Sequence, residues 1–164
     1  MMDKVIRCCF AGHHDVYGEN IFDRIKEVAE NLIVNYGVNE FWVGNYGGFD
    51  GWSASAIREL KMKYSHIELD LVIPYLTEKI NENKEQYYKN YDNIIVAEIQ
   101  ANTPKRFHII KANEFMVDNA DFLICYVERS WGGALRTYEY AKRKNKKIYN
   151  LKSLENLGCC VQLT

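Results

Sequence analysis

Two glycine pairs in this sequence stand where chemistry could occur. They lie in "NYGGFDGWSA" (Asn45–Ala54) and "SWGGALRTYEYA" (Ser130–Ala141), each directly after an apolar run and before a helix-like segment. Glycines in such a turn let the backbone approach a ligand, and the free amides at the start of the following helix favour an anion such as phosphate. One pair alone indicates a tight turn. Two pairs at equivalent positions favour a phosphate-binding crevice that holds both ends of one nucleotide-like ligand.

Aromatic and titratable side chains accompany these turns. An aromatic face in a crevice can stack on a nucleobase. Trp131, beside Gly132, is the best candidate for stacking, whereas Trp52 is expected to pack inward from its helix. Asp50 could face a bound ribose or cap its helix. The pair His13–His14 is typical of a hydrogen-bonding turn, because no third ligand accompanies it at a spacing that would bind metal.

The elements that position these residues alternate along the chain. Apolar residues at helical spacing indicate the helices, and Thr103–Pro104 predicts an N-cap followed by proline at the first helical position. Residues 76–92, polar and rich in tyrosine, predict a short helix and a loop. The expected strands are 5–11, 41–44, 67–74, 94–98, 122–127 and 147–151, and the expected helices are 20–36, 53–64, 103–119 and 133–143.

This alternation, with strands that are apolar on both faces, predicts an α/β fold. The expected architecture is a Rossmann-like three-layer sandwich with a mainly parallel central sheet, formed by one domain over residues 1–164. In such a sheet the ligand crevice lies outside the carboxyl ends of the strands. The candidate site therefore consists of the residues that follow the strands, 12–15, 45–50, 74–75, 98–103 and 128–133.

Composition excludes several functional classes. With 21 basic and 22 acidic residues, the chain has no electrostatic footprint for a long nucleic acid. The longest apolar run is far shorter than the roughly 20 residues that cross a membrane. The chain carries charge from Asp3 and then enters a strand-like run at once, so no signal peptide is expected and the protein is expected to be cytoplasmic.

The cysteines predict neither a disulfide framework nor a metal site. Their number, five, is odd, and no CxxC or Cys/His ligand spacing occurs. Cys8, Cys9 and Cys125 lie in apolar runs, where cysteine is usually a small buried hydrophobe. We therefore expect no metal and no cofactor, and Cys159–Cys160 receive no assignment.

Five segments of the chain, taken in order, resemble the SLOG superfamily of LOG- and DprA-like Rossmannoid domains. They are "FAGHH", "FWVGNYGGFDGWSA", "LVIPY", "NTPKRFHIIKANEFMVDNADFLICYV" and "SWGGALRTYEYAKRKNKKI", and the resemblance covers residues 4–151. More narrowly, the chain is similar to a small single-domain branch common in Firmicutes and their phages. The resemblance implies a nucleotide-derived ligand and self-association. Some superfamily members are phosphoribohydrolases, which cleave the N-glycosidic bond of a nucleoside monophosphate, and others sense NAD- or ADP-ribose-derived signals.

The hydrolase motif of the superfamily is only partly present. Gly132–Gly133 match its glycine pair, and Thr137 and Glu139 stand near its threonine and carboxylate. Trp131 replaces its proline. The catalytic arginine of the hydrolases would fall near Ala112, where this chain has none.

Two further positions also match the superfamily only in part. Asn113 matches a position that is often polar in the superfamily, and His14 stands where the first turn commonly has arginine. Arg106 or Lys111 could supply the missing cation, although neither occupies the motif position. Cleavage of an N-glycosidic bond develops positive charge, and a carboxylate without its partnered cation meets only part of that demand. The preserved turns therefore favour binding over turnover.

Three functional hypotheses follow. The first is a binding protein for an ADP-ribose-like or cyclic nucleotide signal, acting as a stand-alone sensor or a sequestering protein, as a homodimer or larger assembly. The second is a phosphoribohydrolase or N-glycosidase that uses Glu139, with Asp50 and Arg106. The third is an interaction module with a vestigial crevice, in which 87–91 meets a partner. The expected ligand-binding residues are Gly12, His13, His14, Asn45, Gly47, Gly48, Phe49, Asp50, Tyr75, Arg106, Asn113, Ser130, Trp131, Gly132, Gly133 and Thr137.

Overall fold

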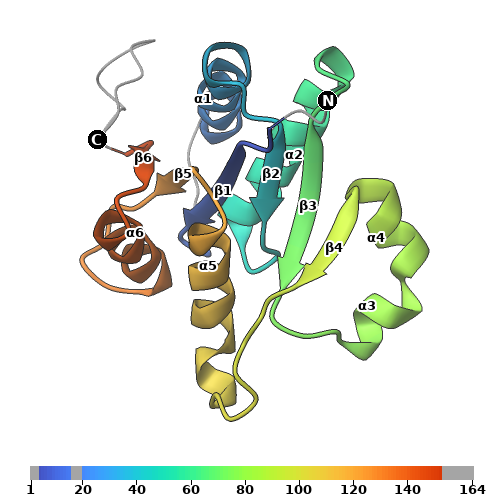
Figure 1. Cartoon of the computed structure of the whole chain (residues 1–164), viewed down its shortest axis with the longest axis vertical. Coiled ribbons are helices and arrows are strands. Elements are labelled where there is room, and N and C mark those ends of the chain that lie inside the picture. The colour runs from blue at the N-terminus through green and yellow to red at the C-terminus, as the bar shows by residue number, and fades with distance from the viewer. Residues whose placement is uncertain (1–3, 16–19, 153–164) are drawn as a thin grey trace.

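The protein contains one sheet of six strands in the order β4-β3-β2-β1-β5-β6 (Figure 1). The computed structural model describes residues 4–15 and 20–152. Every pairing between neighbouring strands is parallel, as the apolar strands predicted. The strands are β1 Arg7–Gly12, β2 Glu40–Val43, β3 Glu68–Ile73, β4 Asn93–Val96, β5 Phe122–Tyr126 and β6 Lys147–Asn150.

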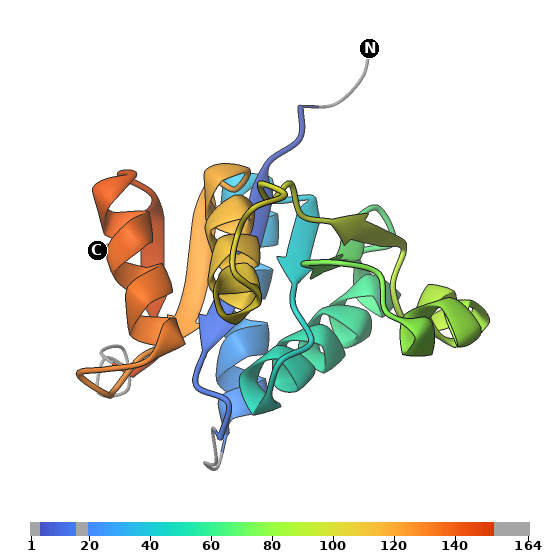
Figure 2. The same cartoon turned by 90° about the horizontal axis from the view of Figure 1, so that it is seen from below.

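Helices cover both faces of this sheet. The buried apolar residues of α1 and α2 belong to one core and those of α5 and α6 to another, and Figure 2 shows the same fold from below. The predicted Rossmann-like three-layer sandwich is confirmed. The helices are α1 Ile21–Tyr36, α2 Gly48–Lys63, α3 Glu78–Glu82, α4 Lys84–Asn90, α5 His108–Asp118 and α6 Gly133–Arg143, with a 3-10 turn η1 at Lys105–Phe107.

Side chains that alternate along the strands supply two large hydrophobic cores, and Leu71, Ile73 and Ile80 form a third, smaller cluster. From β1, Cys8 and Phe10 enter the core beneath α1 and α2, whereas Cys9 and Ala11 enter the core beneath α5 and α6. Cys8, Cys9 and Cys125 are buried free thiols, as predicted. Burial raises the pKa of Cys9 to about 12, so this thiol stays protonated and inert. Cys159 and Cys160 lie outside the described residues.

Helix α1 shows why periodicity located the helices well. Its buried residues recur every three or four positions, which places them on one face. Gly37 then ends the helix with a φ of 71°, and its N–H donates to the carbonyl of Leu32. Apolar spacing and a terminal glycine are both local signals, so they predict a helix without knowledge of the rest of the fold.

Helix α2 differs from its prediction at the start. It begins at Gly48 instead of Ser53, because Gly47, with a φ of 147°, turns the chain from the end of β2 directly into the helix. The longer helix exposes Trp52, which is 46% exposed and packs its edge on Phe22, with 6.4 Å between the ring centroids. The prediction that Trp52 packs inward is therefore wrong.

Helix α5 also begins elsewhere than predicted. Pro104 has an extended conformation and precedes the 3-10 turn, and Phe107 is the N-cap of α5. Thr103 does not cap the helix, because it belongs to a preceding turn in which its N–H donates to Gln100 and its carbonyl contacts the ring of His108.

The connection between β3 and β4 forms two short helices rather than one helix and a loop. Thr77 starts α3 by accepting the N–H of Ile80 through its hydroxyl. Helix α4 buries none of its residues fully, and the ring of its Tyr87 stacks on that of Tyr91, the residue that caps its C-terminus. Across residues 4–15 and 20–152, no helix combines the length and apolar character needed to cross a bilayer.

Candidate functional site

The order of the strands creates a crevice between β1 and β5. Strands β2, β3 and β4 extend the sheet from one side of β1, and β5 and β6 extend it from the other. Open α/β sheets bind ligands at such a reversal, outside the carboxyl ends of the strands. A cavity of about 240 Å³ lies there, and its walls are formed by Phe10, Ala11, Gly12, His13, His14, Tyr46, Asp50, Ile109, Asn113, Arg129, Trp131, Gly132, Gly133 and Ala134.

The second glycine turn opens onto this cavity. Gly132 has a φ of 102°, and a methyl group built on Gly132 or Gly133 would meet no atom of the described residues within 4 Å. Helix α6 begins at Gly133 without a side-chain cap. Thr137, which is buried, donates its hydroxyl to the carbonyl of Gly133 over 3.0 Å and so holds the turn from inside. The start of this helix therefore borders an open space, and a helix N-terminus favours an anion.

The first glycine turn is filled by the protein itself. A methyl group at Gly47 would lie 2.6 Å from the Cα of His14. The N–H of Gly48 donates to the carbonyl of His14 over 2.7 Å, so this amide is already used. Phe49 is buried, and its ring occupies the place of a methyl group at Gly12. The two turns consequently do not form the predicted cradle for two ends of one ligand.

His13 joins the loop after β1 to the turn after β5. Its side chain is buried, and its Nε2 accepts the N–H of Glu128 over 3.0 Å and the N–H of Arg129 over 3.3 Å. Burial, followed by the charge of Arg129, lowers the pKa of His13 and favours the neutral ring that can accept these bonds. This geometry matches the hydrogen-bonding turn that the sequence indicated.

Arg129 lies in the predicted range 128–133, where it was not singled out as a ligand-binding residue, and it lines the wall of this cavity. Its guanidinium forms an ion pair of 2.7 Å with Asp15 and lies over the ring of Trp131, 5.3 Å from the ring centroid. It provides a cation at the crevice, although the arginine of the hydrolase motif is missing from α5. Its position between a strand and the glycine pair was the available signal.

Asp50 lies in the first turn of α2 and reaches back to the preceding loop. Its Oδ2 accepts the N–H of Tyr46 over 3.0 Å, so it caps the entry to the helix without being the N-cap residue, which is Gly47. Burial raises the pKa of Asp50 to about 6. A carboxylic acid that titrates near neutrality in a cavity wall is a candidate for binding ligand hydroxyls.

Several other predicted residues lie outside this cavity. Tyr75 packs on the ring of His108 with 5.6 Å between centroids, and the Arg106 guanidinium lies over Phe107. Asn45 and Ser130 are exposed and do not line it.

The carboxylate and the lysine of the enzyme hypothesis also lie elsewhere. Thr137 and Glu139 line a separate cavity of about 190 Å³ between α5 and α6. Lys111 forms an ion pair of 3.0 Å with Glu114.

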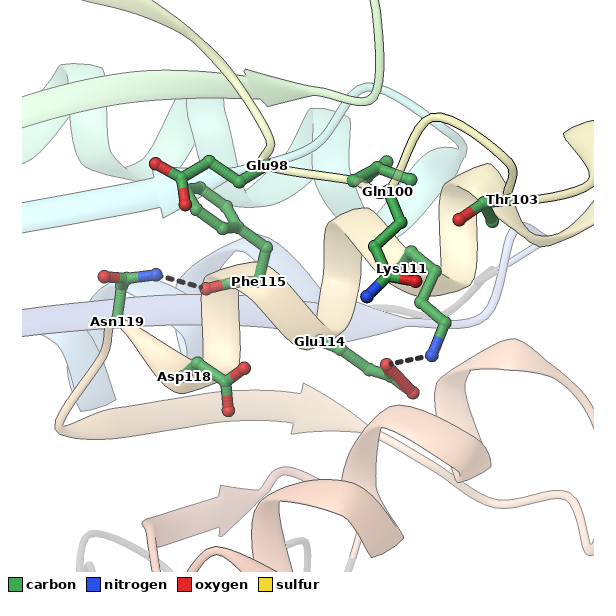
Figure 3. Close-up of a pocket in the computed structure, with 9 residues that line it drawn as sticks. Glu98, Gln100, Thr103, Lys111, Glu114, Phe115, Asp118 and Asn119 are labelled. Atoms are coloured by element: carbon green, nitrogen blue, oxygen red, sulfur yellow. Dashed lines mark hydrogen bonds and ion pairs between the residues drawn. The ribbon is translucent and has the colours of Figure 1, made fainter.

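A larger cavity, of about 500 Å³, lies beside α5 (Figure 3). Glu98, Gln100 and Thr103 approach it from the segment after β4, so the residues after this strand do not join the crevice as predicted. Figure 3 shows the ion pair of Lys111 with Glu114 on the helical wall. The fourth strand end therefore contributes to a different surface.

One group of carboxylates in the described ranges is close enough to hold a metal ion. Glu40, Glu68 and Asp70 place one oxygen each within 4.8 Å of the others. They lie on β2 and β3, and Glu40 and Glu68 begin these strands, away from the ends that form the crevice. Glu40 pairs with Arg7, and Asp70 accepts hydrogen bonds from side chains, so both are already engaged by protein groups.

Comparison with known proteins identifies related chains. The model of the YspA SLOG family matches residues 8–157. A UPF0398 protein of Brevibacillus brevis is 27% identical over 129 residues, which cover 73% of this chain and 69% of that protein.

Two solved structures resemble the fold. DNA processing protein A of Streptococcus pneumoniae has a TM-score of 0.65 at 16% identity, over 94% of this chain and 54% of that one. The molybdenum cofactor carrier protein of Chlamydomonas reinhardtii has a TM-score of 0.55 at 12% identity, over 88% and 75%. This chain thus spans about half the length of the streptococcal protein. At such identities the likeness concerns the fold alone.

Proposed function

This chain belongs to the YspA SLOG family, as its resemblance to the superfamily predicted, and from that premise we propose that it binds a nucleotide-derived small molecule in the crevice between β1 and β5. The observation that carries the proposal is the open glycine turn. Gly132 and Gly133 leave space above the uncapped start of α6, at the point where the strand order reverses. Backbone amides in this arrangement bind a phosphate group of the ligand.

The other walls support a nucleotide rather than a simple anion. Trp131 is 66% exposed and offers a ring face to a base, and Arg129 adds positive charge beside the turn. Asp50 and Asn113 offer polar groups to a sugar. The cavity of about 240 Å³ is smaller than the roughly 300–1,000 Å³ of sites that enclose a drug-sized ligand. The ligand therefore extends beyond the crevice, along Trp131.

The class of ligand follows from the superfamily resemblance. We propose an ADP-ribose-like or cyclic nucleotide signal, which the protein senses or sequesters in the cytoplasm. A cation and an aromatic ring beside a single open phosphate turn suit recognition of such a ligand.

Binding is favoured over turnover. Glu139, the carboxylate required by the phosphoribohydrolase hypothesis, lines a cavity with Arg136 and Arg143 that is separate from the crevice. Asp50 is the carboxyl group in the crevice wall, and its raised pKa keeps it partly protonated near pH 6. The carboxylate of the hydrolase motif is thus separate from the crevice wall, which supports a binding site.

The first experiment is native mass spectrometry of the purified protein, followed by denaturation and identification of any released molecule. ADP-ribose, AMP and 3′,5′-cyclic AMP are then titrated by calorimetry. The test variant is Gly133→Leu, which fills the open turn. Gly51→Leu is its matched control, because a side chain at Gly51 also meets no described atom within 4 Å.

The expected result is a stoichiometric nucleotide-like molecule, or binding of one titrated nucleotide, that is lost in Gly133→Leu and kept in Gly51→Leu. Equal binding by both variants would show that the ligand lies elsewhere. Release of free base from AMP would replace the proposal with the enzyme hypothesis. Absence of any ligand would favour the interaction module, with the exposed Tyr88 as its first residue to test.

The resemblance also implies self-association, and we propose a homodimer or larger assembly. Light scattering coupled to size-exclusion chromatography measures the mass directly. A mass of 19.2 kDa would correspond to a monomer and contradict this part of the proposal.

A further inference from the structure

We infer that His13 is a positioning residue for the crevice: by accepting two backbone N–H groups it fixes the turn after β5, and acidification releases that turn together with Arg129 and Trp131. Hydrogen-bond geometry supports the role of His13 in the turn. Its consequence for ligand affinity rests on the proposed function.

The hydrogen bonds define the protonation state of His13. Nε2 accepts from the backbone of Glu128 and of Arg129, over 3.0 and 3.3 Å. A neutral imidazole has one acceptor nitrogen, so its proton must lie on Nδ1. An imidazolium donates from both nitrogens and would direct an N–H toward two backbone N–H groups. Protonation therefore breaks both bonds at once.

The same turn is held a second time by the loop after β1. Asp15 pairs with the guanidinium of Arg129 over 2.7 Å, while His13 holds the backbone of that arginine. Arg129 in turn lies over Trp131, with 5.3 Å between its Cζ and the ring centroid. Two neighbouring residues of one loop thus position the cation and the aromatic ring of the opposite wall.

Charged groups around His13 come from both loops. Arg129 lowers the pKa of the ring, whereas Glu128 and Asp15 raise it, and burial, the largest influence, lowers it. Lys152 lies 3.5 Å from the carboxylate of Glu128 and partly offsets that acid. The ring is therefore neutral at pH 7 and takes up its proton below the ordinary histidine value of about 6.5.

Fluorine NMR of protein labelled with 5-fluorotryptophan tests the turn directly. Its three tryptophans give three signals, and Trp131→Phe identifies the one from the crevice. Between pH 8 and pH 5.5 we expect the Trp131 signal to shift with one midpoint below 6.5, while the signal of Trp52 does not follow this transition. Trp42 is not a reference, because its Nε1–H donates to Asp70, whose pKa burial raises to about 6.

Two variants separate positioning from a general effect of acid. His13→Gln places an amide oxygen near the position of Nε2, accepts the same N–H groups and does not titrate, so its Trp131 signal should stay constant with pH. His13→Leu removes the acceptor, and its Trp131 signal at pH 8 should match the acidic wild type. If the wild-type signal is constant, or moves equally in His13→Gln, the inference is overturned. His13→Gln decides the matter even where His13→Leu does not fold.

ADP-ribose is the probe for the ligand arm, because the charge of its pyrophosphate does not change over this pH range. We expect its affinity for the wild type to fall about tenfold from pH 7.5 to pH 5.5, as two positioning hydrogen bonds are lost. His13→Gln keeps Asp50 and every other titrating group. If ADP-ribose affinity depends less on pH in this variant than in the wild type, the difference is due to His13. If ADP-ribose does not bind at any pH, the proposed ligand class fails, and the fluorine signal still decides the role of His13.

Discussion

The two glycine turns of this protein have nearly the same sequence and opposite surroundings. Gly47–Gly48 and Gly132–Gly133 each follow a parallel strand and begin a helix without a side-chain cap. At the first turn, the backbone of His14 occupies the space beside Gly47 and accepts the N–H of Gly48. At the second turn no described atom lies within 4 Å of either added methyl group.

This difference teaches that a glycine pair indicates close approach without specifying what approaches. The approaching group at the first turn is the protein's own loop after β1, so glycine is required there for packing. The second turn has no such occupant among the described residues, so its glycines are available to a ligand. Substitutions can test this division, because the first turn should respond in stability and the second in binding.

The largest effect on stability is expected for Gly47→Ala. A φ of 147° is rarely adopted by other residues, and the new methyl group would lie 2.6 Å from the Cα of His14. Strain and overpacking together should lower the free energy of unfolding by about 3 kcal/mol. Urea denaturation measures it. Gly51→Ala in the same helix is the control and should be neutral or stabilising, so equal stability of both variants would show that the first turn is not tightly packed.

The next largest effect is a gain in stability, expected for Asp50→Asn. The folded-state pKa of about 6 lies above the ordinary value of 3.8. Between those values the folded protein holds a proton that the unfolded chain has released, so wild-type stability falls as pH rises through this window and remains lower above it. Asparagine removes this cost and can still accept the N–H of Tyr46. We expect about 1–2 kcal/mol of stabilisation at pH 8 and none below pH 4.

Urea denaturation at both pH values checks the gain. Asp23→Asn is the matched control, because Asp23 holds the equivalent position in the first turn of α1 and is exposed. It should lose a few tenths of a kcal/mol at pH 8, since a carboxylate near a helix start is favourable there. A loss of stability in Asp50→Asn at pH 8 would contradict the burial of an unfavourable charge.

A smaller effect is expected for Thr137→Val. The hydroxyl of Thr137 donates to the carbonyl of Gly133 and so supports the second turn from inside the fold. Its loss should cost about 1 kcal/mol of stability and change ADP-ribose affinity less than about threefold. Thr137→Ser, which keeps the hydroxyl, is the comparison in both assays. A larger loss of affinity with normal stability would mean that this hydroxyl contacts the ligand, as the sequence suggested.

The smallest effect on stability is expected for Gly133→Ala. The methyl group meets open space at the first residue of α6, so stability should stay within about 0.5 kcal/mol of the wild type. ADP-ribose affinity should fall about tenfold, because the methyl group occupies the place of the bound anion. Thermal unfolding and calorimetry measure the two quantities. Unchanged affinity would place the ligand away from this turn and break the comparison.

Sequence reasoning reached most of the architecture through local signals. The bounds of α6 match their prediction, because its apolar residues, its glycine start and its basic end all lie within a few positions of one another. Helices α2 and α5 were misplaced at their starts, where a glycine turn and a proline segment depend on the loops they meet. The local sequence does not show which loops these helix starts will contact, so it could not predict where the two helices begin.

The candidate site was predictable in part for the same reason. Once the strands were known, the rule about their carboxyl ends led to Gly12, His14 and the second glycine pair. The role of Arg129 could not be predicted from the sequence, because Asp15, the partner that orients its side chain, is 114 positions away in the chain. Tyr75 was included because it follows a strand, and Arg106 as a cation on the expected helix 103–119. Their neighbours in space are His108 and Phe107.

The sequence by itself determined the order of strands and helices, the buried cysteines and the edge of the sheet where the candidate site lies. Each depends on periodicity, or on a topological rule that acts on neighbouring elements. The tertiary structure alone decided which glycine turn stays open, because the atoms that close the other one come from a loop far away in the chain. Packing between distant segments, not the residue types in a turn, determines whether its amides remain available.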